Sequence, residues 1–342
     1  MRIITLSLLL CGLVIQSFGV RPPLKGYTYA SEQAPTGKEW QSPENLALNK
    51  EQPHAWFFPF QDIKSARKVL PENSIYWQSL NGNWKFNWAA DPDSRPKDFY
   101  KTDFDVTAWD NIPVPSSWNI YGVQQDGSLK YGVPIYVNQP VIFMHSVKAD
   151  DWRGGVMRTP PTNWTTYKYR NEVGSFRREF EIPEHWDGRE VFISFDGVDS
   201  FFYLWINGMY VGFSKNSRNT ANFNITNYLR SGKNIVAAEV YRNSDGSFLE
   251  AQDMFRLPGI FRTVALYSTP KVQIRDLVAT PDLDNNYTDG SLTIQADIRN
   301  FGKKTAKGYK VCYSLYANKL YSDENEPVIL ARDTKGAAIR NS

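Results

Sequence analysis

The chain has 342 residues, of which 42% are apolar and 22% charged, the composition of a folded globular protein with room for two or three domains. Its 39 basic and 36 acidic residues leave a net charge of only +3, which argues against a protein that binds nucleic acid through a large positive surface. Three histidines and two cysteines argue against a histidine-rich metal site and a disulfide scaffold.

Residues 1–19 predict a secretory signal peptide, because a positive start leads into the apolar run Thr5–Phe18 and then small residues at Ser17 and Gly19. This run is shorter than the roughly 20 residues that span a bilayer, so a permanent membrane anchor is the less favoured alternative. After removal of the signal peptide, Cys312 stands alone and no intrachain disulfide can form. We therefore expect an exported bacterial protein, periplasmic or extracellular, with no membrane span.

Residues 20–59 are polar and proline-containing and then aromatic, which predicts an extended N-terminal arm without its own core. Beyond them, short apolar runs alternate with turn residues, and no long segment has the 3.6-residue period of a helix. The runs Phe201–Ile206 and Met209–Phe213 flank Asn207-Gly208, which predicts a hairpin because both turn positions need positive φ. The sequence thus predicts an all-β fold, with a jelly-roll β-sandwich over residues 60–269.

The last part of the chain, residues 270–342, predicts a second β-domain. Leu292–Ile298 and Tyr309–Tyr316 alternate apolar and polar residues, as half-buried strands do. We interpret the segment as the start of an immunoglobulin-like β-sandwich, of which the last strand or strands are missing. The sequence is therefore expected to be the front part of a longer protein.

Five stretches stand out because a β-core does not require them. They are Val114–Asn119 with Tyr131–Pro140, Phe195–Ser200, Asn219–Thr226, Ser244–Phe255 and Arg256–Arg262. In these residues, and in their order and spacing, the chain resembles the N-terminal part of the β-galactosidases of glycoside hydrolase family 2. The resemblance extends from about Trp56 to about Asp282 and, more loosely, into the last 60 residues.

The resemblance implies a sugar-binding jelly roll, then an immunoglobulin-like domain, then a (β/α)8 barrel with two catalytic glutamates that act with retention. It also implies that Asn138 contacts the galactosyl unit and that Asp253 belongs to a site for a cation and a sugar hydroxyl. An amide both donates and accepts hydrogen bonds, as a sugar hydroxyl does, and a carboxylate is a hard oxygen ligand for Na⁺ or Mg²⁺. The alternatives are that Asn138 is only a turn residue and that Asp253 is solvated or paired with Arg256.

Other conspicuous residues in these stretches are assigned structural roles. Trp118, Trp205 and Phe255 are expected in the core rather than as platforms for a sugar ring. Two departures from the family pattern also stand out. Amides occupy Asn222 and Asn224, where family members often carry carboxylates, and Glu172 occupies a position where proline is frequent.

The resemblance leads to one functional hypothesis and two alternatives. The hypothesis is the N-terminal portion of a β-galactosidase that acts on β-galactosides or galactans, inactive as this chain alone because the catalytic barrel is absent. A full-length form could form a homo-oligomer, as family members often do. The alternatives are a stand-alone carbohydrate-binding module without activity, and a parent enzyme that is a β-glucuronidase or β-mannosidase.

Overall fold

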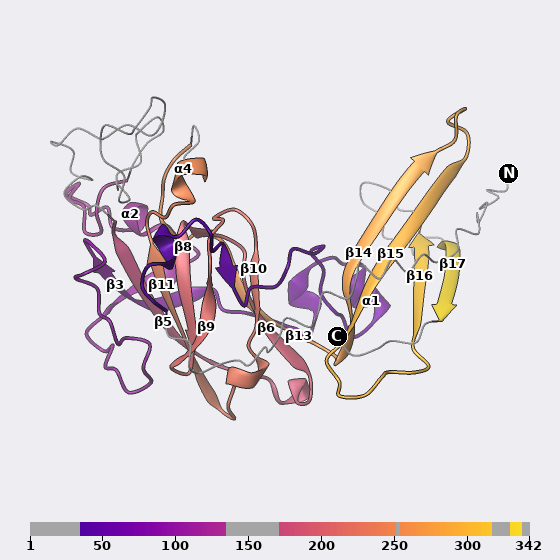
Figure 1. Cartoon of the computed structure of the whole chain (residues 1–342), viewed down its shortest axis with the longest axis horizontal. Helices are drawn as coiled ribbons and strands as arrows, with labels where there is room; N and C mark the ends of the chain where they lie inside the picture. The colour runs from indigo at the N-terminus through magenta and orange to yellow at the C-terminus, as the bar shows by residue number, and fades with distance from the viewer. Residues whose placement is uncertain (1–34, 135–170, 251–253, 317–328, 337–342) are drawn as a thin grey trace. The chain divides into compact units, whose positions relative to one another are not determined.

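The computed structural model describes residues 35–134, 171–250, 254–316 and 329–336. Two compact units make up the chain. Of the described residues, the larger unit comprises those within 35–53 and 58–268, and the smaller comprises 54–57 and those within 269–336. Strands dominate both units (Figure 1), so the prediction of an all-β fold is confirmed. In the described parts of the chain, no helix has the length and apolar character needed to cross a membrane.

The larger unit is a sandwich of two antiparallel sheets. The first sheet has the order β1 (Ala47–Leu48), β9 (Met209–Ser214), β8 (Phe201–Ile206), β11 (Lys233–Tyr241), β5 (Val173–Glu181), β3 (Gly82–Ala89) and β4 (Asp110–Val114). The second has the order β10 (Ala221–Asn224), β6 (Glu190–Phe195), β13 (Val264–Thr269) and β2 (Trp77–Ser79). A short pair is formed by β7 (Val198–Asp199) and β12 (Gly259–Ile260). The short α-helices are α1 (Ile63–Ala66), α2 (Trp118–Tyr121) and α4 (Ser247–Glu250), and the 3₁₀ turns are Glu39–Gln41, Pro71–Asn73, Glu184–Trp186 and Thr226–Tyr228.

The interior strand β8 is buried on both of its faces. Phe202 and Leu204 point into the core between the two sheets. Tyr203 and Trp205, which alternate with them, belong to a second aromatic cluster on the opposite face of the seven-stranded sheet. Successive side chains of a strand point to opposite faces, so a continuous apolar run requires a cover on both sides.

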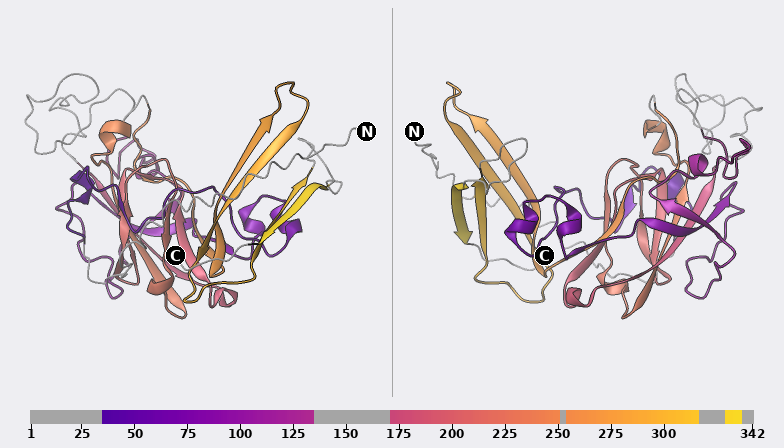
Figure 2. Two further views of the ribbon diagram at one scale, coloured as in Figure 1. Left: turned by 45° about the vertical axis from the view of Figure 1, so that its right-hand side comes forward. Right: turned by 180° about the vertical axis from the view of Figure 1, so that it is seen from behind.

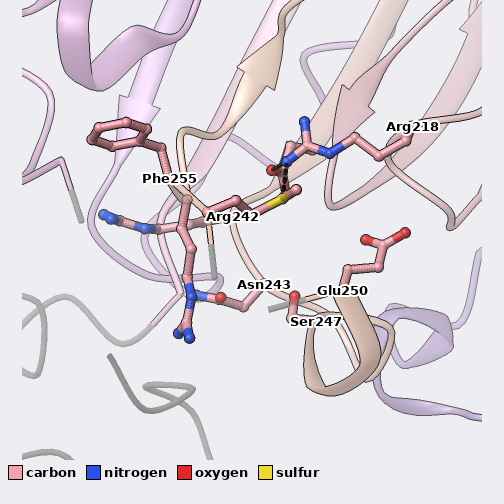
Figure 3. A pocket seen from close by; sticks show the side chains of 9 residues that line it. Arg218, Arg242, Asn243, Ser247, Glu250 and Phe255 are labelled. Carbon is pink, nitrogen blue, oxygen red and sulfur yellow. Dashed lines mark hydrogen bonds and ion pairs between the residues drawn. The ribbon is translucent and has the colours of Figure 1, made fainter. Parts of the chain in front are cut away.

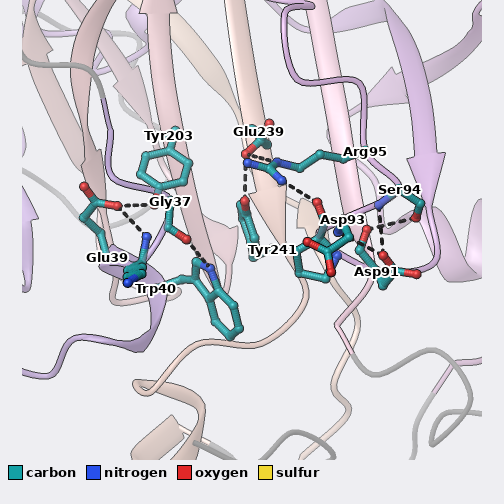
Figure 4. A network of polar contacts seen from close by, with 12 residues as sticks. Gly37, Glu39, Trp40, Asp91, Asp93, Ser94, Arg95, Tyr203, Glu239 and Tyr241 are labelled. Carbon is teal, nitrogen blue, oxygen red and sulfur yellow. Dashed lines mark hydrogen bonds and ion pairs between the residues drawn. The ribbon is translucent and has the colours of Figure 1, made fainter.

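Part of that second cover is the N-terminal arm. The indole of Trp40 stacks on Tyr241 with ring centroids 5.6 Å apart. The hydroxyl of Tyr203 donates to Glu39 Oε2 at 2.5 Å (Figure 4). Strand β1 adds to the edge of the sheet beside β9. The described residues 39–48 of the arm therefore help to cover this face of the sheet.

The hairpin predicted at Asn207-Gly208 is confirmed. Strands β8 and β9 pair on either side of it, and the φ angles of the two residues are 53° and 82°. The side chain of Asn207 also accepts a hydrogen bond from the backbone N–H of Ile235 at 2.9 Å. The turn is thus tied to β11, the strand that leads to the candidate site.

The smaller unit contains two antiparallel ribbons. Strand β14 (Val272–Leu283) pairs with β15 (Gly290–Asn300), and β16 (Lys310–Tyr316) pairs with β17 (Ile329–Gly336). Figure 2 shows both ribbons from two further directions. The expected β-structure is present in this unit, while its immunoglobulin-like arrangement stays a prediction.

Candidate functional site

The two residues predicted to bind ligands, Asn138 and Asp253, lie outside the described residues. The structure does describe the chain up to Pro134, and it describes Glu250 and Met254 on either side of the short stretch that holds Asp253. The candidate site is therefore built from these neighbours and from the side chains that hold them.

Glu250 and Met254 both line one pocket of the larger unit. Figure 3 shows Glu250 among the side chains around it. The pocket has a volume of about 20 Å³, which is room for roughly one water-sized group. Its walls come from the end of β7, the segment between β9 and β10, the residues just after β11, α4 and the segment that precedes β12. The lining residues are Asp199, Arg218, Arg242, Asn243, Ser247, Glu250, Met254, Phe255 and Arg256.

One wall of the pocket is a chain of hydrogen bonds between two carboxylates. Ser217 donates its backbone N–H to Glu250 Oε1 at 2.8 Å and its hydroxyl to Glu250 Oε2 at 2.5 Å. Arg218 donates to Asp199 Oδ2 at 3.2 Å and also contacts the sulfur of Met254 at 3.4 Å. Ser217 and Arg218 therefore fix the chain on both sides of residues 251–253.

Asp199 is an unusual carboxyl group. Burial, together with repulsion from Glu250, raises its pKa to about 7, although Arg218 and Arg242 act in the opposite direction. A carboxyl group with a pKa near neutrality, inside a pocket, is typical of a functional site. Carboxyl groups in structural ion-pair networks can also have a raised pKa. The pKa of Asp199 therefore identifies the pocket as a candidate site but does not indicate which reaction takes place there.

The back of the pocket is held by a buried ion pair between Glu172 and Arg242. Arg242 Nη1 donates to Glu172 Oε1 at 2.5 Å, and the side chains are 2% and 0% exposed. Arg242 Nη2 donates to the carbonyl oxygen of Val133 at 2.7 Å. Arg242 thus contacts the segment that leads towards Asn138 and lines the pocket that contains Glu250 and Met254.

Further donors converge on Glu172. Trp118 Nε1 donates to Glu172 Oε2 at 3.0 Å, and Asn119 Nδ2 donates to the same oxygen at 3.2 Å. Gly132, which has φ +76°, lies against this carboxylate, and a Cβ there would come within 2.6 Å of Glu172 Cδ. These contacts explain a departure from the family pattern, because Glu172 neutralises the buried guanidinium that reaches the pocket.

The arm also holds the turn that leads into α4. Lys215 Nζ donates to the carbonyl oxygen of Ser42 at 2.6 Å and forms an ion pair with Asp245 at 2.9 Å. The backbone N–H of Asp245 donates to the carbonyl oxygen of Trp40 at 2.9 Å. Because α4 begins two residues later and carries Glu250, the arm contributes to the placement of the pocket wall.

The core assignments made from the sequence are right for two aromatic residues and wrong for one. Trp118 and Trp205 are buried, with 0% and 3% exposure. Phe255 is 58% exposed and lines the pocket, so its expected core role is corrected. The physical reason is its position: it lies in the segment before β12 and not in either sheet of the sandwich.

The amide at Asn224 has a structural explanation. Asn224 Nδ2 donates to the buried Glu190 Oε2 at 2.7 Å, and Thr226 donates to Asn224 Oδ1 from its backbone and its hydroxyl. A carboxylate at position 224 would place two negative charges together in a buried site. This departure therefore stabilises the sandwich and does not alter the pocket.

Sequence reasoning missed Asp199 and Arg242 as pocket residues and Glu172 as the partner of Arg242. Asp199 lies inside one of the five conspicuous stretches, and Glu172 is a departure from the family pattern, so a signal existed for both. Arg242 gave none, because nothing local in the sequence indicates which buried carboxylate pairs with an arginine 70 residues away.

Comparison with known proteins places the pocket in a recognised domain. Residues 77–270 match the family model described as the sugar binding domain of glycosyl hydrolases family 2. A protein of Priestia megaterium named beta-galactosidase is 42% identical over 264 residues, which is 77% of this chain and 24% of that relative. A protein of Halalkalibacterium halodurans with the same name is 36% identical over 259 residues, 76% of this chain and 23% of the relative.

The chain therefore spans about a quarter of the length of these curated relatives. Among solved structures, a glycosyl hydrolase family 2 member from Bacteroides cellulosilyticus is similar with a TM-score of 0.53 at 19% identity, over 78% of this chain and 29% of that one. At this identity the likeness shows the fold alone. The family model covers more than half of the sequence, and by that match this chain belongs to glycoside hydrolase family 2.

Proposed function

We propose that this chain is the sugar-binding, N-terminal part of an exported β-galactosidase that hydrolyses terminal β-D-galactosides with retention. The observation that carries the proposal is the pocket lined by Asp199, Arg242 and Glu250, which lies within the family-matched residues and includes two of the conspicuous stretches of the sequence, those of Asp199 and Glu250. The relatives named beta-galactosidase support the choice of galactosides among family 2 substrates.

In this proposal the larger unit shapes the entrance to the active site and does not break the glycosidic bond. Asn138 contacts the sugar and Asp253 shares its carboxylate between a sugar hydroxyl and a cation. Their described neighbours in the chain support these roles, because Arg242 contacts Val133 and lines the pocket beside Glu250 and Met254.

A carboxylate oxygen is the ligand that a hard cation such as Na⁺ or Mg²⁺ prefers. Asp199 and Glu250 are not proposed as ligands, because Asp199 is paired with Arg218 and both oxygens of Glu250 accept hydrogen bonds from Ser217. Asp253 would hold the cation, which would supply a positive charge that orients the sugar hydroxyl.

The test is an assay of the full-length natural protein that carries this sequence. We expect it to hydrolyse p-nitrophenyl β-D-galactoside faster than the corresponding β-glucuronide and β-mannoside. Proton NMR of the early reaction should show the β-anomer of galactose as the first product, as retention requires. A preference for the glucuronide or the mannoside would overturn the choice of substrate.

A second measurement separates the role of this part from that of the whole. Residues 20–342 expressed alone are expected to release no product from the galactoside, since the proposal places acid/base catalyst and nucleophile elsewhere. Measurable hydrolysis by this fragment would contradict the proposal that the acid/base catalyst and the nucleophile lie outside residues 20–342.

A further inference from the structure

The hairpin of β14 and β15 in the smaller unit turns through the triplet Asn286-Tyr287-Thr288 (Figure 1). An asparagine followed two residues later by threonine or serine, with any residue except proline between them, is the acceptor sequence for N-linked glycans in secreted proteins. So short a pattern also arises by chance. The structure around each triplet therefore has to show whether an enzyme could reach it.

The sequence contains three such triplets, and the structure distinguishes two of them. Asn224 is 6% exposed at the end of β10, and its amide nitrogen donates to Glu190 Oε2 at 2.7 Å. This nitrogen is therefore closed to an enzyme. Asn286 lies in a continuous exposed segment, residues 277–291, with no buried residue on either side of it. The third triplet, at Asn163, lies outside the described residues.

The turn presents its triplet without burying any part of it. The backbone N–H of Asp284 donates to the carbonyl oxygen of Asp289 at 2.9 Å, which closes the turn. Tyr287, at the middle of the triplet, is 81% exposed with a φ of 54°. The hydroxyl of Thr288 donates to the carbonyl oxygen of Asn286 at 3.2 Å. The hydroxyl by which the triplet is recognised thus lies beside the acceptor residue, on an exposed side chain.

Asp284 adds a further recognition element, a carboxylate two residues before Asn286. Its side chain belongs to the same exposed turn, where Oδ1 accepts from the backbone N–H of Thr288 at 2.7 Å. The oligosaccharyltransferases of bacteria select an asparagine with an acidic residue at this position, because a basic side chain of the enzyme can bind the carboxylate. Neither of the other two triplets has an acidic residue there.

We propose that Asn286 is the attachment site of an N-linked glycan in the natural protein. Asn286 Nδ2 attacks C1 of the first sugar of a lipid-linked pyrophosphoryl oligosaccharide. The N–C1 bond forms while the bond between C1 and the phosphate oxygen breaks, so that the lipid pyrophosphate leaves with the bonding electrons. The amide nitrogen loses one proton to a base of the transferase, and no group is oxidised or reduced.

This inference goes beyond the proposed hydrolysis of galactosides. It rests on one part of the proposed function, the export of the protein, because the glycan is transferred outside the cytoplasm. It does not rest on the proposed reaction, since Asn286 belongs to the smaller unit and the pocket is lined by residues of the larger one. Loss of the glycan is accordingly expected to leave the hydrolysis of galactosides unchanged.

The experiment uses the full-length natural protein, isolated from the organism that produces it. Trypsin releases residues 276–299 as one peptide, because no lysine or arginine lies between Arg275 and Arg299. Mass spectrometry with electron-transfer fragmentation should find sugar residues on this peptide and locate them on Asn286. The matched control is the tryptic peptide 219–230, which contains the buried Asn224 and should carry none. An unmodified peptide 276–299 would overturn the inference.

Variants produced in the same organism test which residues are recognised. Asn286→Gln and Thr288→Ala should lose the glycan, whereas Thr288→Ser should keep it because serine retains the hydroxyl. Asp284→Asn keeps an oxygen that can accept from the N–H of Thr288 but removes the negative charge, and it should lose the glycan as well. Sugar that persists on peptide 276–299 of Asn286→Gln would refute the attachment site. A glycan on Asp284→Asn would refute the role of the carboxylate.

Cell fractionation separates this result from the proposed function. An exported protein with an unmodified Asn286 overturns the glycan and keeps the export. A protein that stays in the cytoplasm with an unmodified Asn286 overturns both. Hydrolysis of a galactoside is measured on the same samples, and its absence beside a modified Asn286 removes the proposed reaction and keeps the glycan.

Discussion

Glu172 and Arg242 form an ion pair that is closed to solvent, with 2.5 Å between Glu172 Oε1 and Arg242 Nη1. Removing either charge alone leaves the other buried, which is expected to reduce the free energy of unfolding by about 3–5 kcal/mol. Glu172→Gln and Arg242→Met are the single variants. The double variant removes both charges while the glutamine oxygen still accepts from Trp118.

The double variant is therefore expected to be less destabilised than the sum of the two singles, by at least about 1 kcal/mol. Urea unfolding of the four proteins measures this coupling. Additive effects would show that the two side chains do not depend on each other for burial.

Gly132 is predicted to be intolerant of a side chain for a reason beyond its backbone conformation. Gly132→Ala would place a Cβ against the Glu172 carboxylate, whereas Gly127, also at positive φ, has nothing within 4 Å of such a Cβ. Gly127→Ala is expected to cost about 1 kcal/mol, the penalty of the left-handed conformation. Gly132→Ala should cost at least about 2 kcal/mol more, as measured by urea unfolding, and equal costs would contradict the predicted clash.

Asn224 is predicted to require its amide. Asn224→Asp would put a second carboxylate next to the buried Glu190, and we expect a loss of about 1–3 kcal/mol in unfolding free energy at pH 7. The loss should shrink as the pH falls and a proton is shared between the two carboxyl groups. Asn111→Asp, at an exposed site, is the control, and an equal loss there would argue against a specific repulsion.

Asp199 is predicted to make stability depend on pH. Its pKa is raised to about 7 in the folded protein by burial, whereas an unfolded aspartate has a pKa of about 3.9. Between these values the folded protein holds a proton that the unfolded chain has released, so stability falls as the pH rises from about 4 to about 7. The contribution of this single group to the slope is at most about 1.4 kcal/mol per pH unit.

Asp199→Asn removes that contribution. Unfolding free energies of both proteins are measured from pH 4 to 8. The value for the variant minus the value for the wild type should increase as the pH rises to about 7 and should stay constant above it. Parallel curves over the whole range would contradict the raised pKa.

The fold was largely predictable because its signals are local. The apolar run of β8 indicates a strand, and Asn207-Gly208 indicates the turn, since positive φ is required at both positions. What the sequence does not show is which layer covers each face of β8. Trp40 lies more than 150 residues away from this strand in the sequence, and only the folded chain brings it onto Tyr241.

The candidate site was predictable only in part, because its geometry depends on distant pairings. Motif resemblance pointed to the segment around Glu250, which the structure places at a pocket. The partners Glu172 and Arg242 meet across strands, and their pairing follows from the register of β11 on β5 rather than from any local pattern. Phe255 was assigned to the core because aromatic residues usually are, yet its segment runs outside the sheets.

The contacts of the arm set a lower limit on the part of this protein that can fold by itself. A recombinant version that began at residue 77, where the family match starts, would lack the indole over Tyr241 and the strand beside β9. The uncovered aromatic face would meet water, and β9 would become an open edge able to pair with other molecules. Such a version should aggregate, so the autonomous folding unit is larger than the region by which the family is recognised.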